Sequence, residues 1–553
     1  MTDVEVGQSR ETPDVDGAYP RLSELQIHEL ARYGRPRLTH AAEVLYQAGD
    51  VDCELIVVLS GLVAVIDPNK PDEPIGVHGP GRFIGELGLL TGQAALLTAV
   101  VREPGEVLTL PLDGLKEVAL KDAVLADLML RALLIRRTVH IGLGAGLRIL
   151  GSRFSPDSRR LRDFLARNRL PHRWIDLEED RDAEAMLCQL GVAPEETPVV
   201  IWRGEQVLRN PSNAELAELL GLRHGSIEQT VCDLLIVGAG PAGLAAAVYG
   251  ASEGLNTVLL DSVATGGQAG TSSRIENYLG FPAGISGMEL ADRAVIQASR
   301  FGAQITVPAG VVSLASEDGR HLVALDTGEQ LAARAVLVAA GVHYRRLDVP
   351  GTKQLAASIY YAATPVEAAM CRNDPVVIVG GGNSAGQAAV FLSDHAEQVH
   401  LIVRNTVLDQ DMSRYLADRI ARTPRIEVHL RTQVRELVGD RLMESVIVEH
   451  LDTSETSRLA ARSLFVFIGS EPNVQWLGDS LGLDDKGFIL TGQAAAAHVS
   501  DEQGDARLLL LETTRRGVFA AGDVRSGSVK RVAAAVGEGS LVVRLVHERL
   551  SDG

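Results

Sequence analysis

Residues 232–243 read Cys232-Asp-Leu-Leu-Ile-Val-Gly238-Ala-Gly240-Pro241-Ala242-Gly243 and decide the fold. An apolar run leads into three glycines, and the alanine-rich stretch Leu244-Ala-Ala-Ala-Val follows them. At this spacing Gly238 permits a tight turn, Gly240 lets a pyrophosphate approach the backbone, and Gly243 lets a helix pack closely on the strand. The stretch therefore predicts a strand, a glycine-rich turn and a helix that together hold a dinucleotide.

Two later segments support this interpretation. Thr257-Val-Leu-Leu-Asp261 predicts a second strand that ends in an acid, at the distance needed to hold a ribose hydroxyl. The run Val376-Val-Ile-Val-Gly380-Gly-Gly382-Asn383-Ser384-Ala385 repeats the fingerprint between another predicted strand and helix. Two fingerprints in one chain indicate two dinucleotides.

The length and the charge of the chain limit its class and its partners. It has 553 residues, of which 46% are hydrophobic and 23% charged, as in ordinary globular proteins. At roughly 150 residues per domain, the length predicts about three to four domains. The 53 basic and 72 acidic side chains give a formal charge of −19, and no strong basic patch offsets it. We therefore expect neither nucleic acid nor a membrane as a partner.

The cysteines and the N-terminus point to a reducing compartment. Cys53, Cys188, Cys232 and Cys371 are far apart in sequence, so they predict neither a disulfide framework nor a Cys-x-x-Cys pair, and no metal site is predicted. The first residues lack the basic and then apolar pattern of a signal peptide, and residues 1–20 are expected to be a disordered tail. The uncharged stretches 234–252 and 375–393 contain glycine-rich turns, so they are not expected to span a membrane. A cytoplasmic protein is expected.

Residues 21–140 predict a small β-barrel closed by a helix. Two β-rich runs flank Gly61, and apolar residues recur at helical spacing from Leu125 to Leu133. Within the barrel, Phe83-Ile-Gly85-Glu86-Leu-Gly-Leu89 resembles the phosphate-binding cassette of cyclic-nucleotide-binding domains, in which Gly85 and Glu86 would contact the phosphate and the ribose. That family also has an arginine about nine residues after the glutamate, where this chain has Ala95. Loss of the arginine argues against ordinary cyclic-nucleotide sensing, and leaves open a different ligand or a barrel used for packing or dimerisation.

Residues 146–222 resemble a thioredoxin or glutaredoxin domain. The predicted order is strand, helix, strand, then strand and a C-terminal helix capped by Asn213, with Pro198 where the family places its cis-proline. The redox loop reads Phe154-Ser155-Pro-Asp-Ser158, with serine at both cysteine positions, so a scaffold or docking role is expected. The polar residues 223–229 are expected to be a linker.

From about residue 229 to residue 553 the chain resembles low-molecular-weight thioredoxin reductase. The motifs that carry this resemblance, besides the two fingerprints, are Gly266-Gly267-Gln268, Glu276-Asn277-Tyr278, Val336-Leu-Val-Ala-Ala-Gly341 and Gly517-Val-Phe-Ala-Ala-Gly522-Asp523. The resemblance implies an FAD domain in two parts, residues 230–345 and 465–553, with an NAD(P)H domain inserted at 346–464. It also implies the residues that bind each cofactor. Those for FAD are Gly238, Gly240, Pro241, Ala242, Gly243, Asp261, Gly267, Gln268, Asn277, Gly522, Asp523, Arg531, Val532 (in place of the usual glutamine) and Ala533, and those for NAD(P)H are Gly380, Gly382, Asn383, Ser384, Ala385 and Arg404.

Two departures from the family affect the chemistry. Thioredoxin reductases have Cys-Ala-Thr-Cys where this chain reads Ala362-Ala363-Thr364-Pro365, so Ala362 and Pro365 occupy the redox positions. Cys371 is nearby but has no partner cysteine and is interpreted as structural. The family's His-Arg-Arg-x-x-x-Arg becomes Val403-Arg404-Asn405-x-x-x-Asp409, and the single arginine favours NADPH through its 2′-phosphate, with NADH as the alternative.

The sequence thus predicts an α/β protein with two Rossmann-like domains, preceded by the barrel and the thioredoxin-like domain. We expect an NAD(P)H-dependent FAD oxidoreductase that needs no catalytic side chain for hydride transfer and has no internal redox disulfide. Its acceptor would be ferredoxin, flavodoxin, a quinone, dioxygen or an external disulfide, and the barrel would gate turnover. The alternative is a ligand-sensing regulatory flavoprotein with structural FAD. A homodimer is expected by resemblance.

Overall fold

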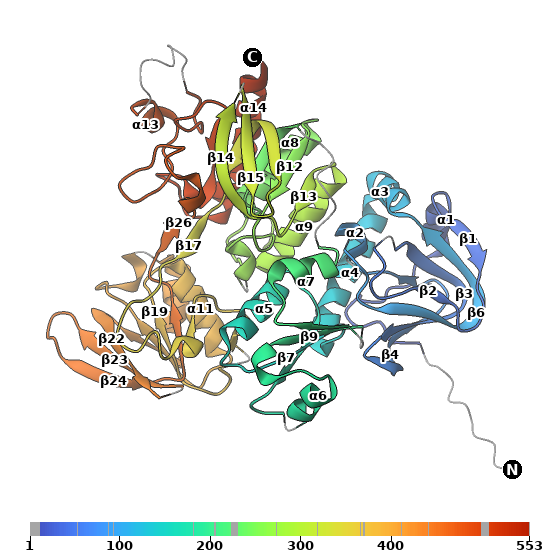
Figure 1. Cartoon of the computed structure of the whole chain (residues 1–553), viewed down its shortest axis with the longest axis horizontal. Coiled ribbons are helices and arrows are strands. Elements are labelled where there is room, and N and C mark those ends of the chain that lie inside the picture. Colours follow the sequence, from blue (N-terminus) through green and yellow to red (C-terminus); the bar gives the residue numbers. More distant parts are fainter. Residues whose placement is uncertain are drawn as a thin grey trace. The chain divides into compact units, whose positions relative to one another are not determined.

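The protein forms two compact units, Met1–Glu228 with Thr306–Pro308, and Gln229–Ile305 with Ala309–Gly553 (Figure 1). A computed structural model describes residues 11–51, 53–86, 88–91, 93–180, 182–203, 206–222, 231–272, 274–317, 319–364, 367–368, 371–410, 412–440, 442–498 and 508–551.

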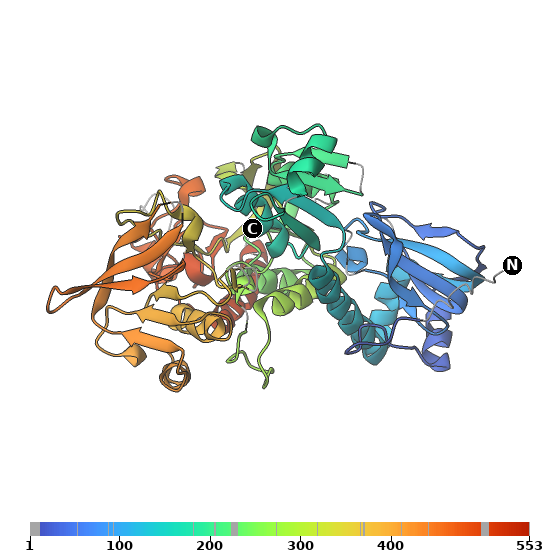
Figure 2. The same ribbon diagram turned by 90° about the horizontal axis from the view of Figure 1, so that it is seen from below.

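The first unit begins with an antiparallel β-barrel, as the sequence predicts. Its long strands β3 and β6 pair along most of their length, and β1, β2, β4 and β5 complete the sheet (blue in Figure 2). Helix α4 follows the barrel and buries Leu125, Met129 and Leu133. The elements are α1 (Glu24–Ala31), β1 (Arg35–Leu38), β2 (Val44–Tyr46), β3 (Leu55–Asp67), β4 (Lys70–His78), β5 (Phe83–Ile84), α2 (Gly88–Thr91), β6 (Thr98–Leu110), α3 (Leu112–Lys121) and α4 (Ala123–Leu143).

The second part of this unit has the strand and helix order expected of a thioredoxin-like domain. Strand β7 pairs in parallel with β8 and antiparallel with β9, and the Thr197–Pro198 peptide bond before β9 is cis. Ser155 caps helix α5, and the buried Ser158 lies beside Pro198 and Gly151. The elements are β7 (Leu147–Gly151), α5 (Pro156–Arg167), β8 (His172–Asp176), α6 (Ala183–Gln189), β9 (Val199–Trp202), β10 (Gln206–Arg209) and α7 (Asn213–Leu219).

Of the predicted tail, residues 1–10 lie outside the described residues, whereas Ala18 and Tyr19 are buried, because Tyr19 packs its ring against His78. Helix α7 is capped by Ser212 and not by Asn213, since Ser212 forms a capping box with Glu215. The predicted linker 223–229 lies outside the described residues.

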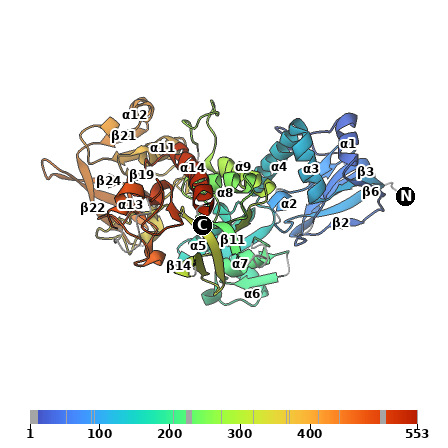
Figure 3. The ribbon, with the colours of Figure 1, turned by 90° about the horizontal axis from the view of Figure 1, so that it is seen from above.

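The second unit contains two sheets built around the two fingerprints, one mixed and one parallel. In the first sheet β11 pairs in parallel with β12 and β16, and β27 joins β16 from far along the chain. Helices α8 and α14 pack against each other beside it (Figure 3). The elements are β11 (Val231–Val237), α8 (Pro241–Ser252), β12 (Thr257–Leu260), α9 (Gly287–Arg300), β13 (Gln304–Thr306), β14 (Val311–Glu317), β15 (Arg320–Leu325), β16 (Gln330–Val338), β27 (Val518–Ala520), the 3-10 turn η7 (Gly522–Val524) and α14 (Val532–Ser551).

The second sheet is inserted into the first domain and has the strand order β18-β25-β19-β20-β21. Helices α11 and α12 cover one of its faces (Figure 3), and the three-stranded sheet β22–β24 packs on the opposite face (orange in Figure 2). A two-stranded ribbon, β17 with β26, flanks the insertion. The elements are β17 (Val342–Tyr344), β18 (Ile359–Tyr360), β19 (Val376–Val379), α11 (Asn383–Ser393), β20 (Val399–Ile402), α12 (Arg414–Ala421), β21 (Ile426–His429), β22 (Thr432–Gly439), β23 (Met443–His450), β24 (Thr456–Ala460), β25 (Ser463–Val466), β26 (Ser470–Pro472) and α13 (Gly492–Ala496).

Both uncharged stretches fold as strand, turn and helix. Within the described ranges, every helix is too short or too polar to traverse a bilayer.

The first unit buries two histidines, and burial makes their protonated form unfavourable. Burial, followed by the charge of Arg136, lowers the pKa of His78 and of His140 from 6.5 to about 3. Both imidazoles are therefore neutral in the folded barrel near pH 7, whereas in the unfolded chain they gain a proton below about pH 6.5. Their contribution to stability is complete above that pH and is lost as the pH falls toward 3.

We predict that acidification from pH 7.5 to pH 5 destabilises the barrel by about 2 kcal/mol for each of these histidines. Calorimetric unfolding of the full chain at the two pH values measures the effect, and the variant His78→Gln tests its origin. The acid sensitivity of the variant should be smaller. An equal loss of stability in the variant and the native chain would contradict the assignment to His78.

Candidate dinucleotide sites

The first fingerprint forms a turn with no room for side chains. Gly238 has φ +113°, and a Cβ there would overlap the backbone of Ala339. A Cβ on Gly243 would overlap the carbonyl oxygen of Gly238. Both glycines are thus required for the first turn of α8 to pack on the loop after β11.

The N-terminus of α8 is open to an anion. The N-cap Gly240 has no side chain that could accept hydrogen bonds from the free N–H groups of the first turn. Pro241 is the first residue of the helix, where no N–H is needed because that position has no partner within the helix. The nearest atom to a Cβ on Gly240 would be Gly267 Cα at 3.9 Å. The space beside Gly240 is therefore bordered by backbone within 4 Å, which leaves room for a pyrophosphate.

Asp261 lies directly after β12, where the sequence predicts a ribose contact. Its carboxylate accepts hydrogen bonds from Ala239 N at 2.9 Å, Val263 N at 3.0 Å and Ala264 N at 3.2 Å. A carboxylate can accept about four hydrogen bonds. Asp261 thus fixes the fingerprint turn and keeps capacity for one further donor.

The second part of this domain meets the first at α8. A Cβ on Gly539 of α14 would overlap the carbonyl oxygen of Ala242, and one on Gly522 would lie 3.1 Å from the Ala242 Cβ. The turn that contains Gly522 and Asp523 therefore lies at the same end of α8 as the fingerprint. Burial raises the pKa of Asp523.

Glu538 holds this turn from α14. Its carboxylate accepts the Gly522 N–H at 2.7 Å and pairs with the Arg525 guanidinium at 2.5 Å. Both side chains of the pair are less than one-fifth exposed. Sequence reasoning missed Glu538 because it is 16 residues from Gly522 and no motif marks it.

The other predicted residues of this site vary in burial. Gln268 donates from its side-chain amide to the carbonyl of Val342, which links the loop after β12 to β17. Val532 begins α14 and is partly buried. Asn277, Arg531 and Ala533 are exposed.

The second fingerprint repeats the first geometry. Gly380 has φ +148°, and a Cβ there would overlap the carbonyl oxygen of Phe467 and lie 3.1 Å from the Ala385 Cβ. Gly382 is an N-cap without a side chain, so the N-terminus of α11 is also open. Asn383 accepts a hydrogen bond from Ser413 N at 2.7 Å, which ties α11 to the start of α12.

Tyr344 joins the two sites and was not predicted. Its phenol hydrogen-bonds to Ser384 of the second fingerprint, and its ring packs edge-on against Phe467 with the centroids 5.9 Å apart. Burial, together with the Asp523 carboxylate, raises its pKa. Tyr344 thus lies between the second fingerprint and Asp523 of the first domain.

The residues expected to select the pyridine nucleotide are exposed at the end of β20. Arg404 and Asp409 are both exposed, and no ion pair joins them in the described part of the chain. Asn405 Nδ2 lies 3.5 Å from the position of a Cβ on Gly381. The Arg404 guanidinium is therefore accessible to a phosphate.

The redox position of the family has no thiol here. Ala362 and Ala363 lie between β18 and β19 of the second sheet, and Pro365 lies outside the described residues. Burial raises the pKa of Cys371 to about 11 and that of Cys232 to about 12. No disulfide joins the four cysteines, all of which the structure describes.

The barrel cassette uses its glutamate internally. The partly buried Glu86 carboxylate accepts hydrogen bonds from Leu96 N at 3.1 Å and Leu97 N at 2.9 Å. These amides directly follow Ala95. A hollow of about 520 Å³ in this unit is lined by other residues, among them Tyr46, Cys53 and Thr109, and does not include the cassette.

Two families of known proteins match separate segments of the chain. The family model of the pyridine nucleotide-disulphide oxidoreductases matches residues 232–539, and that of the cyclic nucleotide-binding domain matches residues 37–122. A thioredoxin reductase of Treponema pallidum is 34% identical over 314 residues, which cover 57% of this chain and 95% of that protein. A 34.2 kDa protein in the rubredoxin operon of Clostridium pasteurianum is 31% identical and covers 59% of this chain and 99% of its own length.

Solved structures agree with these relatives. The crystal structure of the T. acidophilum thioredoxin reductase matches with a TM-score of 0.53 and 28% identity, and the match covers 58% of this chain and 99% of that one. The crystal structure of the Lactococcus lactis thioredoxin reductase matches with a TM-score of 0.53 and 25% identity, and the match covers 58% of this chain and 100% of that one. The chain therefore belongs to the pyridine nucleotide-disulphide oxidoreductase family, in a thioredoxin reductase-like form preceded by a cyclic nucleotide-binding domain.

Proposed function

We propose that this protein is an NAD(P)H-dependent FAD oxidoreductase that passes electrons to an external acceptor without an internal redox disulfide. The observation that carries the proposal is the pair of open helix N-termini, at Gly240 and at Gly382, in a chain whose redox cysteines are replaced. FAD and NADPH are the cofactors of the thioredoxin reductase-like family.

The side chains of this protein bind and orient the cofactors. The α8 and α11 N-termini would each hold a pyrophosphate, Asp261 a ribose hydroxyl, and Asp523 the ribitol. The cofactors held by these residues would supply the hydride transfer and the onward passage of electrons. Tyr344 would position the two sites, because its hydroxyl holds Ser384.

The two cysteines of the second unit, Cys232 and Cys371, are buried and support an external acceptor. Thiolates carry out disulfide exchange, and burial disfavours the thiolate of both Cys371 and Cys232. The acceptor classes that remain in the proposal are ferredoxin, flavodoxin, a quinone, dioxygen and an external disulfide. The names of the thioredoxin reductase relatives favour a disulfide or a redox protein among these.

We predict that one equivalent of NADPH bleaches the flavin absorbance near 450 nm completely under anaerobic conditions. A reductase with an internal disulfide would need a second equivalent, because the disulfide takes the first electron pair. Titration with dithionite gives the same count without a pyridine nucleotide. A requirement for two equivalents would reveal an internal disulfide, and no bleaching would favour a sensor with structural FAD.

We predict that Arg404→Ala weakens NADPH binding about ten- to a hundredfold and leaves NADH binding nearly unchanged. The expected size follows from the loss of hydrogen bonds between a guanidinium and the 2′-phosphate. Stopped-flow reduction of the flavin at increasing nucleotide concentration measures both affinities. Arg414→Ala, at an exposed arginine of α12, is the matched control. Equal weakening of NADPH binding and NADH binding would show that Arg404 does not contact the 2′-phosphate.

We predict that Glu538→Gln weakens FAD binding by about tenfold or more, because Gly522 N–H and Arg525 lose their charged acceptor. Recovery of FAD fluorescence on dilution measures the release of the flavin. Glu548→Gln, at an exposed glutamate of the same helix, is the control. Unchanged FAD retention in Glu538→Gln would remove Glu538 from the positioning residues of the site.

A further inference from the structure

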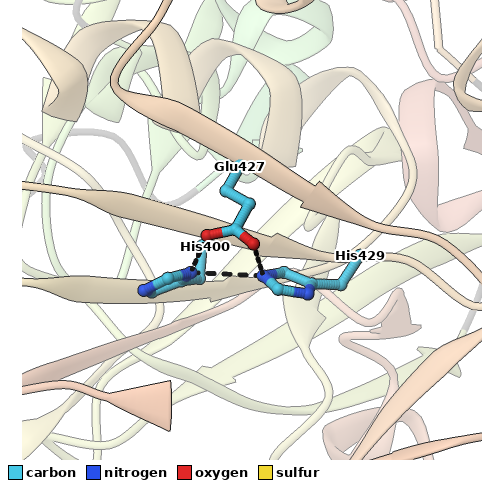
Figure 4. A group of neighbouring side chains, drawn as sticks. All are labelled: His400, Glu427 and His429. Atoms are coloured by element: carbon cyan, nitrogen blue, oxygen red, sulfur yellow. Dashed lines mark hydrogen bonds and ion pairs between the residues drawn. The ribbon is translucent and has the colours of Figure 1, made fainter.

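Two histidines and a glutamate meet on neighbouring strands of the inserted domain (Figure 4). His400 lies on β20, and Glu427 and His429 lie on β21, the strand at the sheet edge. His400 is in register with Glu427, and alternate residues of a strand share a face, so Glu427 and His429 point the same way. This is the face that carries Ile402 and the core against β22–β24, and not the face covered by α11 and α12.

The distances between the three donor atoms are those of ligands around one ion. His400 Nδ1 lies 3.2 Å from His429 Nε2 and 3.2 Å from a Glu427 carboxylate oxygen, and His429 Nε2 lies 3.7 Å from the other oxygen. Two ligands of a tetrahedral Zn²⁺, each bonded at about 2.0–2.1 Å, are roughly 3.3 Å apart. Small side-chain adjustments would therefore bring all three atoms onto one metal.

The protonation and the exposure of the cluster also suit a metal. Burial is the main influence on both imidazoles and lowers their pKa, against the opposing effect of Glu427, so the neutral form that ligates metals prevails at pH 7. The histidine side chains are 13% and 19% exposed, whereas that of Glu427 is 57% exposed. The carboxylate side of the cluster is thus open to an entering ion.

We propose that His400, Glu427 and His429 form a binding site for one divalent transition-metal ion, with water or another small ligand completing the coordination. Two imidazoles and one carboxylate suit Zn²⁺ and its first-row neighbours better than Mg²⁺ or Ca²⁺, which prefer oxygen ligands. The site lies outside the fingerprint residues.

The test is Zn²⁺ binding to the full-length flavoprotein without an affinity tag, after chelator treatment. Competition with a chromogenic chelator gives the stoichiometry and the affinity. We expect one Zn²⁺ per chain, and at least about a hundredfold weaker binding in His400→Ala and in His429→Ala, since even outer-shell partners contribute about 10–100-fold. Glu427→Gln, at the more exposed position, should weaken binding without affecting folding.

The control is His547→Ala. His547 also faces a carboxylate, Glu253 at 3.1 Å, but without a second imidazole. Zn²⁺ affinity should be unchanged in this variant, and the FAD content of every variant confirms folding. The proposal is overturned if the native chain binds no Zn²⁺, or if Glu427→Gln and the two histidine variants bind it as the native chain does. In that case the three side chains only hydrogen-bond to one another.

Discussion

The second unit depends on direct backbone contact around the first turn of α8. Gly243 meets the carbonyl of Gly238, and Gly539 of α14 meets the carbonyl of Ala242, at distances that no side chain permits. These contacts bring two segments of the chain, separated by the whole inserted domain, to one helix end. The open N–H groups, Asp261 and Asp523 converge there for this reason. Packing of this kind tolerates no added methyl group, because interiors are close-packed and backbone cannot yield as a side chain can.

Partly or fully buried carboxylates hold the loops that the glycines leave without side chains. Asp261 fixes the fingerprint turn, Glu538 fixes the turn of Asp523, and Glu86 fixes the segment after the barrel cassette. Glu512 has the same role near the C-terminus, where it accepts from Gly517 N and pairs with Arg549. Each carboxylate offsets its desolvation with several N–H donors. In the barrel, the Leu96 and Leu97 N–H groups satisfy the Glu86 carboxylate without a nucleotide.

The sequence predicts those parts of the site that local spacing determines. Both fingerprints, their strands and their helices form where the glycines indicate, and the membership of the family is confirmed. Prediction from the sequence fails for residues whose contacts come from helices or strands far away in the chain. Glu538 contacts Gly522 only because α14 packs on α8, and Tyr344 reaches Ser384 only through the ribbon of β17 and β26. The cap of α7 was misplaced by one residue, since Ser212 and Asn213 are both good caps and the position of Glu215 decides between them.

The cluster of His400, Glu427 and His429 shows a different limit of prediction from the sequence. The pattern Glu427-x-His429 indicates two side chains on one face of a strand, but nothing in the sequence gives the alignment of that strand with His400. The same geometry has a consequence for assembly. Strand β21 is the outermost of its sheet, and unpaired edges recruit strands from other chains. A slip of one residue would turn Glu427 and His429 to the opposite face, away from His400. Contacts among the three side chains therefore favour the native register of β21 on β20, while the outer edge of β21 stays unpaired in its sheet.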